Sequence, residues 1–335
     1  MNFTSTPTTE ALLKMNRVQI APATLDFTPT PVTELSSRRQ WLGTLTAGAA
    51  LALLPRLAAQ ETKKTRSPIL VETPPPTHPP LQPVDLARLP AGQTRLDLFL
   101  LLGQSNMKGR GLMPETPSRD PRIVMMHFKD DAWYVARHPL HLTGDAKTFK
   151  GADNAGVGPG LAFAEELLSR APDRRIGLIP CAVGGTSIML WQKGERIYDQ
   201  VLRRAKLAVA AGQPVQGRIR AALWLQGEGD RPDARFALYE KRLHQLVRDL
   251  RADLGDPALP FIACTIGEMT VGDGAARKAD INRLLLALPG KVPNTACVDA
   301  RELKTNIGDE VHLDTAAQNE VGRRFAAAYH TLTAK

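Results

Sequence analysis

The chain has 335 residues, a formal net charge of +9 and an apolar fraction of 43%. This composition suits a globular α/β protein with a sizeable core, and the length allows one large domain or two small ones. A basic surface favours anionic polymers, but aromatic residues make up only 5% and no basic run contains interleaved aromatics. We therefore expect no nucleic acid partner.

The first 60 residues are predicted to be a leader rather than part of the fold. Arg38 and Arg39 precede a moderately apolar stretch, residues 41–54, that is too short to span a bilayer comfortably. Twin arginines before such a stretch resemble a Tat export signal. We expect cleavage after Ala59 and export to the periplasm or the exterior, without a membrane span afterwards. An uncleaved leader would instead anchor the chain to the membrane.

Residues 61–93 contain clusters of proline, which predict an extended, semi-rigid linker. The folded domain is then expected over residues 94–335. Its cysteines are odd in number and not closely spaced, which argues against a disulfide framework or a zinc site. We expect Cys181, Cys264 and Cys297 to be buried as small apolar side chains.

Short apolar runs alternate with amphipathic segments throughout the expected domain. This alternation predicts βαβ units, and hence a three-layer α/β/α sandwich with a mainly parallel sheet. The predicted strands are 96–102, 123–128, 176–182, 221–225, 261–266 and 295–298, and the predicted helices are 160–170, 198–211, 234–254, 275–287 and 315–334.

The first predicted strand runs directly into a polar, glycine-rich turn. In "LFLLLGQSNMKGRG", residues 98–111, Ser105 stands between two amides just after the strand. The carboxyl ends of parallel strands are where open α/β sheets hold their ligands. Ser105 is therefore a candidate nucleophile, and the alternative is a serine that only caps the next helix.

Two later strands end in a similar way. "GLIPCAVGGTSIMLW" ends its strand at paired glycines, where the N–H of Gly185 could stabilise an oxyanion, although paired glycines also form simple tight turns. "AALWLQGEGD" places the amide of Gln226, and Glu228 two residues later, in the same predicted crevice. Capping is the alternative role for these two side chains.

A carboxylate and an imidazole occur together near the end of the chain. In "GDEVHLD", Asp309 precedes His312 by three residues, so one short loop can deliver a base and the acid that orients it. An isolated pair of this kind is weak evidence, because a capping Asp near a surface His is common. After Ser105, however, it completes the order Ser, Asp, His.

Taken together, these blocks resemble the SGNH hydrolase superfamily, and within it the sialate O-acetylesterase-like carbohydrate esterases. The matching blocks are "LLGQSNMKGRG", "VGPGLAFAEEL", "PCAVGGTSIMLW", "WLQGEGD" and "DEVHLD", in this order over roughly residues 96–325. The resemblance implies a flavodoxin-like α/β/α sandwich that removes acetyl groups from oligo- or polysaccharides without a metal or cofactor.

The resemblance also implies roles for individual residues. Ser105 matches the nucleophile, His312 the base and Asp309 the acid that orients the base. Lys108 stands where a small residue is more usual, and its charge near the mouth would bias the enzyme towards acidic sugars. The oxyanion hole is expected from Ser105, Gly185 (with Gly158 as second choice) and Gln226, and support or substrate contact from Gln104, Asn106 and Glu228.

Two other functions remain as alternatives. A lipid or thioester hydrolase on the same fold should have a broad apolar rim, whereas the turns here are polar and rich in glycine. A carbohydrate-binding protein without catalysis has no need for Ser105, Asp309 and His312 together.

Overall fold

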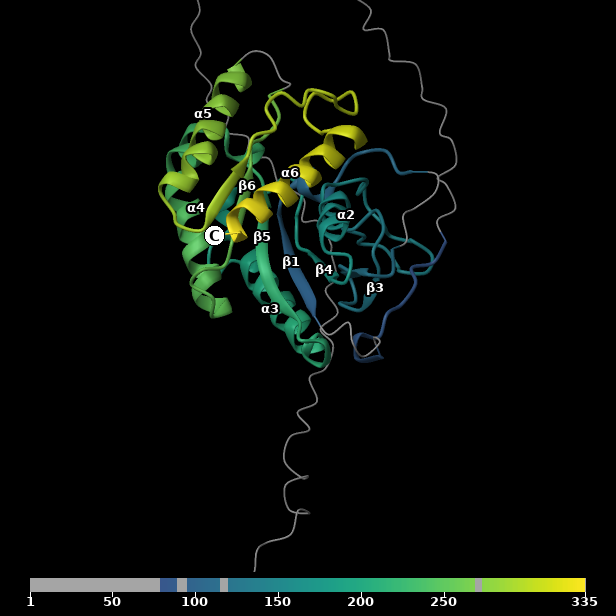
Figure 1. The fold of residues 1–335 in the computed structure, drawn as a ribbon. Helices are drawn as coiled ribbons and strands as arrows, with labels where there is room; N and C mark the ends of the chain where they lie inside the picture. Colours follow the sequence, from purple (N-terminus) through teal and green to yellow (C-terminus); the bar gives the residue numbers. More distant parts are fainter. Residues whose placement is uncertain (1–78, 89–94, 115–119, 269–272, 335) are drawn as a thin grey trace, which may run out of the picture. The chain divides into compact units, whose positions relative to one another are not determined.

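The computed structural model describes residues 79–88, 95–114, 120–268 and 273–334 (Figure 1). The predicted leader and the first part of the predicted linker lie outside the described residues. The described strands are β1 (Leu96–Gly103), β2 (Ile123–Met126), β3 (Trp133–Val135), β4 (Arg175–Pro180), β5 (Arg218–Leu225), β6 (Phe261–Cys264) and β7 (Thr295–Val298). The described α-helices are α1 (Ser105–Lys108), α2 (Gly160–Arg170), α3 (Arg196–Ala211), α4 (Asp233–Leu254), α5 (Asp273–Ala287) and α6 (Thr315–Thr333).

The described strands form one sheet in the order β3-β2-β4-β1-β5-β6-β7. All neighbouring pairs are parallel except β2 and β3, which pair antiparallel at one edge. From β1 the chain first builds one half of the sheet and then crosses to β5 on the other side. The carboxyl end of β1 is therefore the switch point of the topology, where α/β sheets form a ligand crevice. The predicted fold class is confirmed.

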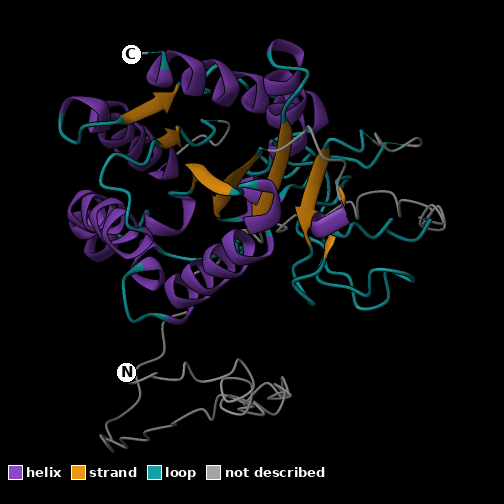
Figure 2. Ribbon diagram, turned by 60° about the horizontal axis from the view of Figure 1, so that its bottom comes forward, coloured by secondary structure: helices purple, strands orange, loops and turns teal. Residues whose placement is uncertain are grey.

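The central strand β1 is buried along its whole length because helices cover both faces of the sheet (Figure 2). Its side chains alternate between two cores: Phe99 and Leu101 belong to one, and Leu98 and Leu100 to the other. Full burial of such a side chain contributes about 1.5–3 kcal/mol. This explains why the sequence shows a continuous apolar run here rather than an alternating one.

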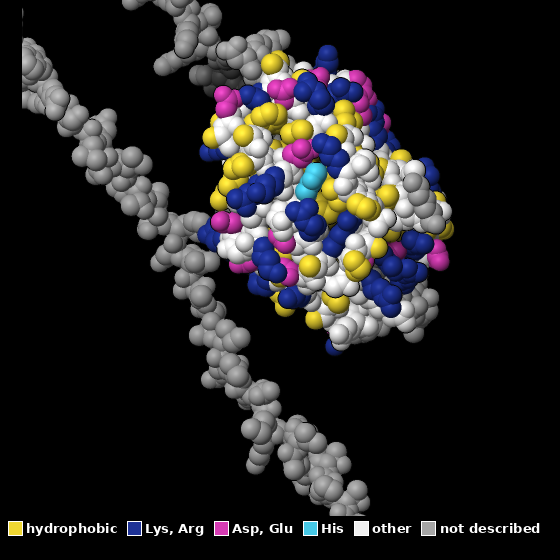
Figure 3. Space-filling model, turned by 90° about the vertical axis from the view of Figure 1, so that its left-hand side faces the viewer, with side chains coloured by type: hydrophobic (Ala, Val, Ile, Leu, Met, Phe, Trp, Pro, Cys, Tyr) yellow, Lys and Arg dark blue, Asp and Glu magenta, His cyan; other side chains and the backbone are white. Residues whose placement is uncertain are grey.

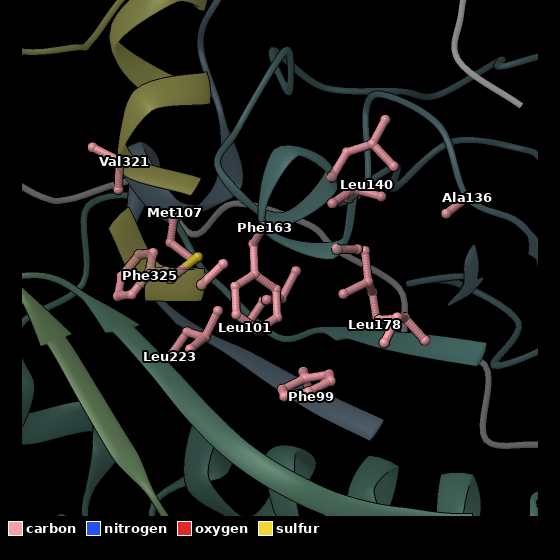
Figure 4. Packing of buried hydrophobic residues seen from close by; sticks show 14 of the residues in the cluster. Phe99, Leu101, Met107, Ala136, Leu140, Phe163, Leu178, Leu223, Val321 and Phe325 are labelled. Carbon is pink, nitrogen blue, oxygen red and sulfur yellow. The ribbon is translucent and has the colours of Figure 1, made fainter. Parts of the chain in front are cut away.

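The first core lies between the sheet and the helices α2 and α6 (Figure 4). The ring of Phe163 from α2 meets that of Phe99 edge to face, with centroids 4.8 Å apart, and Phe325 enters from α6. Gly322 lets the two helices approach closely, since a Cβ there would lie 2.4 Å from the Pro159 carbonyl oxygen. The second core lies under α3, α4 and α5 and contains Trp191 and Trp224, stacked edge to face at 5.1 Å.

The domain includes residues that the sequence analysis placed in the linker. Within residues 79–88, Leu81 and Leu86 are 4% exposed, and the N–H of Val84 donates to the Trp133 carbonyl at 2.8 Å. These contacts cover the antiparallel edge strand β3, so packed structure begins before residue 94. No helix among the described residues is long and apolar enough to span a membrane.

The cysteines follow the prediction in part. Cys181 and Cys264 are buried with free thiols, whereas Cys297 is only partly buried. Burial raises the pKa of all three thiols, and that of Cys297 rises to about 12. They are therefore thiols rather than thiolates at neutral pH.

Two buried histidines should make the fold sensitive to mild acid. Burial lowers the pKa of His138 to about 4, and burial together with the charges of Lys108 and Arg204 lowers that of His141 to about 3. Below pH 6.5, the ordinary pKa of histidine, these two side chains bind protons in the unfolded chain but stay neutral in the folded chain. The free energy of unfolding is therefore highest above pH 6.5 and falls as the pH drops. Between pH 8 and pH 5, each histidine should cost about 2 kcal/mol of unfolding free energy.

Urea titrations at several pH values test this expectation. His141→Asn should flatten the dependence of the unfolding free energy on pH, whereas removal of the less buried His244 should change it much less. An equal slope in all three proteins would contradict the assignment.

Candidate active site

The turn after β1 is fixed by one glycine. Gly103 has φ +133°, and a Cβ at this position would lie 2.1 Å from the carbonyl oxygen of Leu225 on the neighbouring strand β5. Only glycine fits, and the N–H of Gln104 then donates to that same carbonyl at 3.0 Å. The chain turns sharply at this point, so Ser105 begins the short helix α1 at the switch point of the sheet.

Ser105, His312 and Asp309 form one continuous hydrogen-bonded line. The Oγ of Ser105 lies 2.8 Å from Nε2 of His312, and Nδ1 of His312 lies 2.5 Å from Oδ2 of Asp309. The imidazole is 21% exposed and the carboxylate 40%, so the line runs from the buried serine towards solvent. With Nδ1–H donated to Asp309, Nε2 presents its lone pair to the serine hydroxyl.

The loop that carries Asp309 and His312 is a tight turn before α6. Gly308 and Glu310 both have positive φ, and Asn306 forms an isolated bridge with Leu313 across the loop. Asp314 caps α6 by accepting the N–H of Ala317 at 2.9 Å.

Asp309 is held as a charged group. Its Oδ1 accepts the backbone N–H groups of Val311 and His312 at 3.0 and 2.9 Å. Burial alone would raise the pKa of Asp309, but the hydrogen bonds from the His312 ring and from these two N–H groups outweigh it, so the pKa lies below its ordinary value.

Asn106 joins the serine turn to the histidine loop. Its Nδ2 donates to Glu228 Oε1 at 2.7 Å and to the carbonyl of Val311 at 3.1 Å, while its Oδ1 accepts the N–H of Leu313 at 3.0 Å. The two bonded backbone groups lie on either side of His312. Asn106 therefore fixes the imidazole relative to Ser105.

Glu228 lies behind Asn106, in the 3-10 turn η4 (Glu228–Asp230) that follows β5. Burial raises the pKa of its carboxyl group, although the hydrogen bond from Asn106 and the charges of Lys278 and His312 act in the opposite direction. Its Oε2 is buried without a hydrogen-bond partner among the described residues. Among the described residues, Glu228 is joined by hydrogen bonds to the histidine loop through Asn106 and not to His312 itself.

Gln226 does not point its amide into the crevice, contrary to the prediction from the sequence. The side chain is fully buried, and Nε2 donates to the Thr186 carbonyl at 2.9 Å and to Oδ2 of Asp230 at 2.5 Å. Both amide hydrogens are therefore in use. Asp230 also accepts the Ser187 hydroxyl at 2.5 Å and the N–H of Ile188 at 2.9 Å, so it ties the turn after β4 to the turn after β5.

Gly184 of the paired glycines borders the serine. A Cβ on Gly184 would lie 3.9 Å from Cβ of Ser105, whereas a Cβ on Gly185 would meet no atom within 4 Å. Gly185 has φ +72°, which shapes the turn. The second choice, Gly158, packs against the backbone of Met107 to Gly109 and supports α1 from behind.

Lys108 does not present its charge at the mouth of the active site, contrary to the prediction. Lys108 is 8% exposed and forms an ion pair with Asp153, so its charge is compensated and turned away from solvent. Arg110 lies beside the same glycine as the serine, because its Nη2 is 3.3 Å from the position that a Cβ on Gly184 would take. Burial lowers the pKa of Arg110, while the charges of Asp153 and Asp309 act in the opposite direction.

Gln104 links two of the turns that border the serine. Its Oε1 accepts the N–H of Gly229 at 3.3 Å, which joins the turn after β1 to the turn after β5. Asp230, the last residue of "WLQGEGD", is a further residue of this site, and its position two residues after Glu228 in that block is the sequence signal for it. Within the described part of the chain, no group of three or more His, Cys, Asp or Glu side chains is arranged to hold a metal ion.

Comparisons with known proteins agree with this architecture. Residues 95–331 match the family described as carbohydrate esterase, sialic acid-specific acetylesterase. A probable carbohydrate esterase from Arabidopsis thaliana is 34% identical over 251 residues, which cover 69% of this chain and 89% of that protein.

Solved structures show the same relationship. The X-ray structure of the Arabidopsis thaliana protein superposes with a TM-score of 0.60 at 33% identity, over 71% of this chain and 98% of that one. The crystal structure of NanS gives a TM-score of 0.57 at 18% identity, over 71% and 97%, and supports the fold alone. The chain belongs to the sialic acid-specific acetylesterase family of carbohydrate esterases, and it is a carboxylic ester hydrolase.

Proposed function

We propose that this protein is a serine esterase that removes O-acetyl groups from oligo- or polysaccharides. The observation that carries the proposal is the line of hydrogen bonds from Ser105 through His312 to Asp309, with distances of 2.8 and 2.5 Å. A serine hydroxyl is a weak nucleophile at neutral pH and requires an adjacent base, which this line provides.

The proposed reaction has two halves. Nε2 of His312 takes the proton of Ser105 as Oγ attacks the acetyl carbonyl, and the imidazolium is stabilised by Asp309. His312 then gives this proton to the sugar oxygen as the C–O bond of the ester breaks, which leaves an acetyl-enzyme. Water, activated by His312, attacks the acetyl-enzyme and releases acetate, and the proton returns to Ser105.

The oxyanion formed in both halves needs donors close to Ser105. We assign this role to the backbone N–H of Ser105 and to N–H groups of the Gly184–Gly185 turn, which borders the serine. Gln226 supports the turn through its bond to the Thr186 carbonyl. It would have to give up one of its two hydrogen bonds to reach the oxyanion itself.

Acetate release from a panel of acetylated glycans tests the proposal and its two alternatives. We expect turnover of acetylated sugars and of a chromogenic acetate, with activity falling steeply for long acyl chains. Preference for long acyl chains or thioesters would favour a lipid or thioester hydrolase. Glycan binding without acetate release would favour a carbohydrate-binding protein.

We also propose that the chain is exported through its twin arginines. The support is Arg38 and Arg39 before the apolar stretch of residues 41–54, all outside the described residues. Replacing both arginines by lysine should retain the precursor in the cytoplasm, as followed by cell fractionation. Unchanged export of that variant would contradict a Tat route.

A further inference from the structure

A pocket of about 560 Å³ that is lined mainly by charged residues opens where β5 leads into α4. Its wall includes Glu228 and Gly229. The carboxylate of Glu228 accepts from Asn106 at 2.7 Å, and the N–H of Gly229 donates to Gln104 at 3.3 Å. Gln104 and Asn106 flank Ser105 in the chain, so these two bonds tie the pocket wall to the turn that carries the serine.

Two exposed arginines in the pocket wall are held in place by the turn η4. Nε of Arg231 donates to the Glu228 carbonyl at 3.1 Å, and Nη1 of Arg235 donates to the Gly229 carbonyl at 3.0 Å. Among the described residues, no carboxylate lies within 4.0 Å of either guanidinium, so their charges are not compensated by an ion pair. Part of each guanidinium is thus fixed by backbone, and its other N–H groups remain for a ligand.

A third arginine in the same wall, Arg277, has a different role. It pairs with Asp233 and with Asp280, and its guanidinium stacks over the ring of Phe236 at 4.1 Å. Asp233 is the exposed carboxylate of the pocket, and the positive charge of Arg277 compensates its negative charge. The wall therefore keeps a net positive charge, and Figure 3 shows that Lys and Arg side chains are spread widely over this side of the molecule, the side of α4 and α5.

We propose that this pocket is a subsite for an anionic oxygen group on the glycan, a sugar carboxylate or a sulfate ester, bound by Arg231 and Arg235. The proposal rests on the proposed function, because it places the charged sugar unit next to the acetyl group that reacts with Ser105. Arginine is the side chain best suited to this task, since its planar fork of N–H donors matches two oxygens of one anion. Lys108, which the sequence offered for acidic sugars, is buried against Asp153 and is not available.

The test compares three substrates that differ in charge. These are O-acetylated xylo-oligosaccharides, which are neutral, the same oligosaccharides carrying sulfate esters, and O-acetylated oligogalacturonates, which carry carboxylates. The ratio of kcat/KM for an anionic substrate to kcat/KM for the neutral one is measured in wild type and in Arg231→Gln, Arg235→Gln and the double variant. Arg248→Gln is the matched control, because Arg248 is an exposed arginine of α4, the helix that carries Arg235, and it lies outside the pocket.

We expect the wild-type ratio to be well above one and to fall about tenfold with each arginine removed, through KM rather than kcat. Preference for carboxylate over sulfate, or the reverse, then identifies the anion. The ratio in Arg248→Gln should stay at the wild-type value. A wild-type ratio near one, or a ratio unchanged in the double variant, would overturn the subsite.

Calorimetry with non-acetylated oligogalacturonate and sulfated xylo-oligosaccharide separates this proposal from the proposed function. Binding of either anion that is lost in the double variant supports the subsite even if no acetate is released. Equal binding of both anions by the double variant and wild type rejects the subsite, while acetate release from the neutral substrate would still support the esterase.

Discussion

Asp309→Asn is expected to lower kcat by about 10⁴ with little change in KM. The carboxylate accepts Nδ1–H of His312 at 2.5 Å and so holds Nε2 ready to take the serine proton. An asparagine can offer its N–H instead, which favours the wrong imidazole tautomer. In serine proteases the equivalent change costs about 10⁴ in kcat. Steady-state kinetics on one acetylated substrate measure the effect.

Glu228→Gln is the matched comparison, because Glu228 is a second carboxylate tied to the histidine loop. In the structure Glu228 contacts Asn106 rather than His312, so its loss should act through the position of the histidine loop and through stability. We expect a smaller decrease in kcat than for Asp309→Asn, accompanied by a lower Tm. An inactive Glu228→Gln beside an active Asp309→Asn would show that the acid is assigned wrongly.

Ser105→Ala should reduce kcat by about 10⁶, since removal of a triad nucleophile leaves only the contribution of binding and the oxyanion hole. The fold should be little affected. Ser105 is buried at the start of α1, but within the described part of the chain its Oγ bonds only the imidazole, and Gly103 and Asn106 hold the turn without it. The check is acetate release together with a melting curve of the same preparation.

A serine outside the hydrogen-bonded line of Ser105, His312 and Asp309 provides the control for the loss of kcat in Ser105→Ala. Ser169→Ala removes an exposed hydroxyl that bonds only the Glu166 carbonyl in α2, and it should retain wild-type turnover. Substantial acetate release by Ser105→Ala, above that of the protein-free reaction, would contradict Ser105 as the nucleophile.

The sequence predicts much of the fold because apolar runs and turn residues report directly on strands and their ends. The pattern predicts strand 295–298 and helix 160–170 with the bounds found in the structure. The edge strand β3 was missed because its three residues are too few to show a period and it pairs antiparallel. The packing of residues 79–88 is not predicted, because a proline-rich composition does not show which leucines pack against the folded domain.

The site is predictable where it depends on strand ends and short spacings. Ser105 follows β1, and Asp309 precedes His312 by three residues on one loop, so both features can be read locally. The direction of Gln226 cannot, because it depends on Asp230 and on the Thr186 carbonyl from a turn 40 residues earlier.

The same limit applies to the charges around the site. Burial of Lys108 depends on its pairing with Asp153, which lies in a loop 45 residues after the helix α1. Spacing along the chain does not show which cation remains open to a ligand.

The most direct test of the account is to identify the residue that becomes acylated. The protein is treated with a serine-directed phosphonate, digested, and the modified peptide is sequenced by mass spectrometry. The account predicts one adduct per chain, on Ser105, that forms much more slowly in Asp309→Asn. An adduct on another residue, or full acetate release by protein that carries the Ser105 adduct, would contradict it.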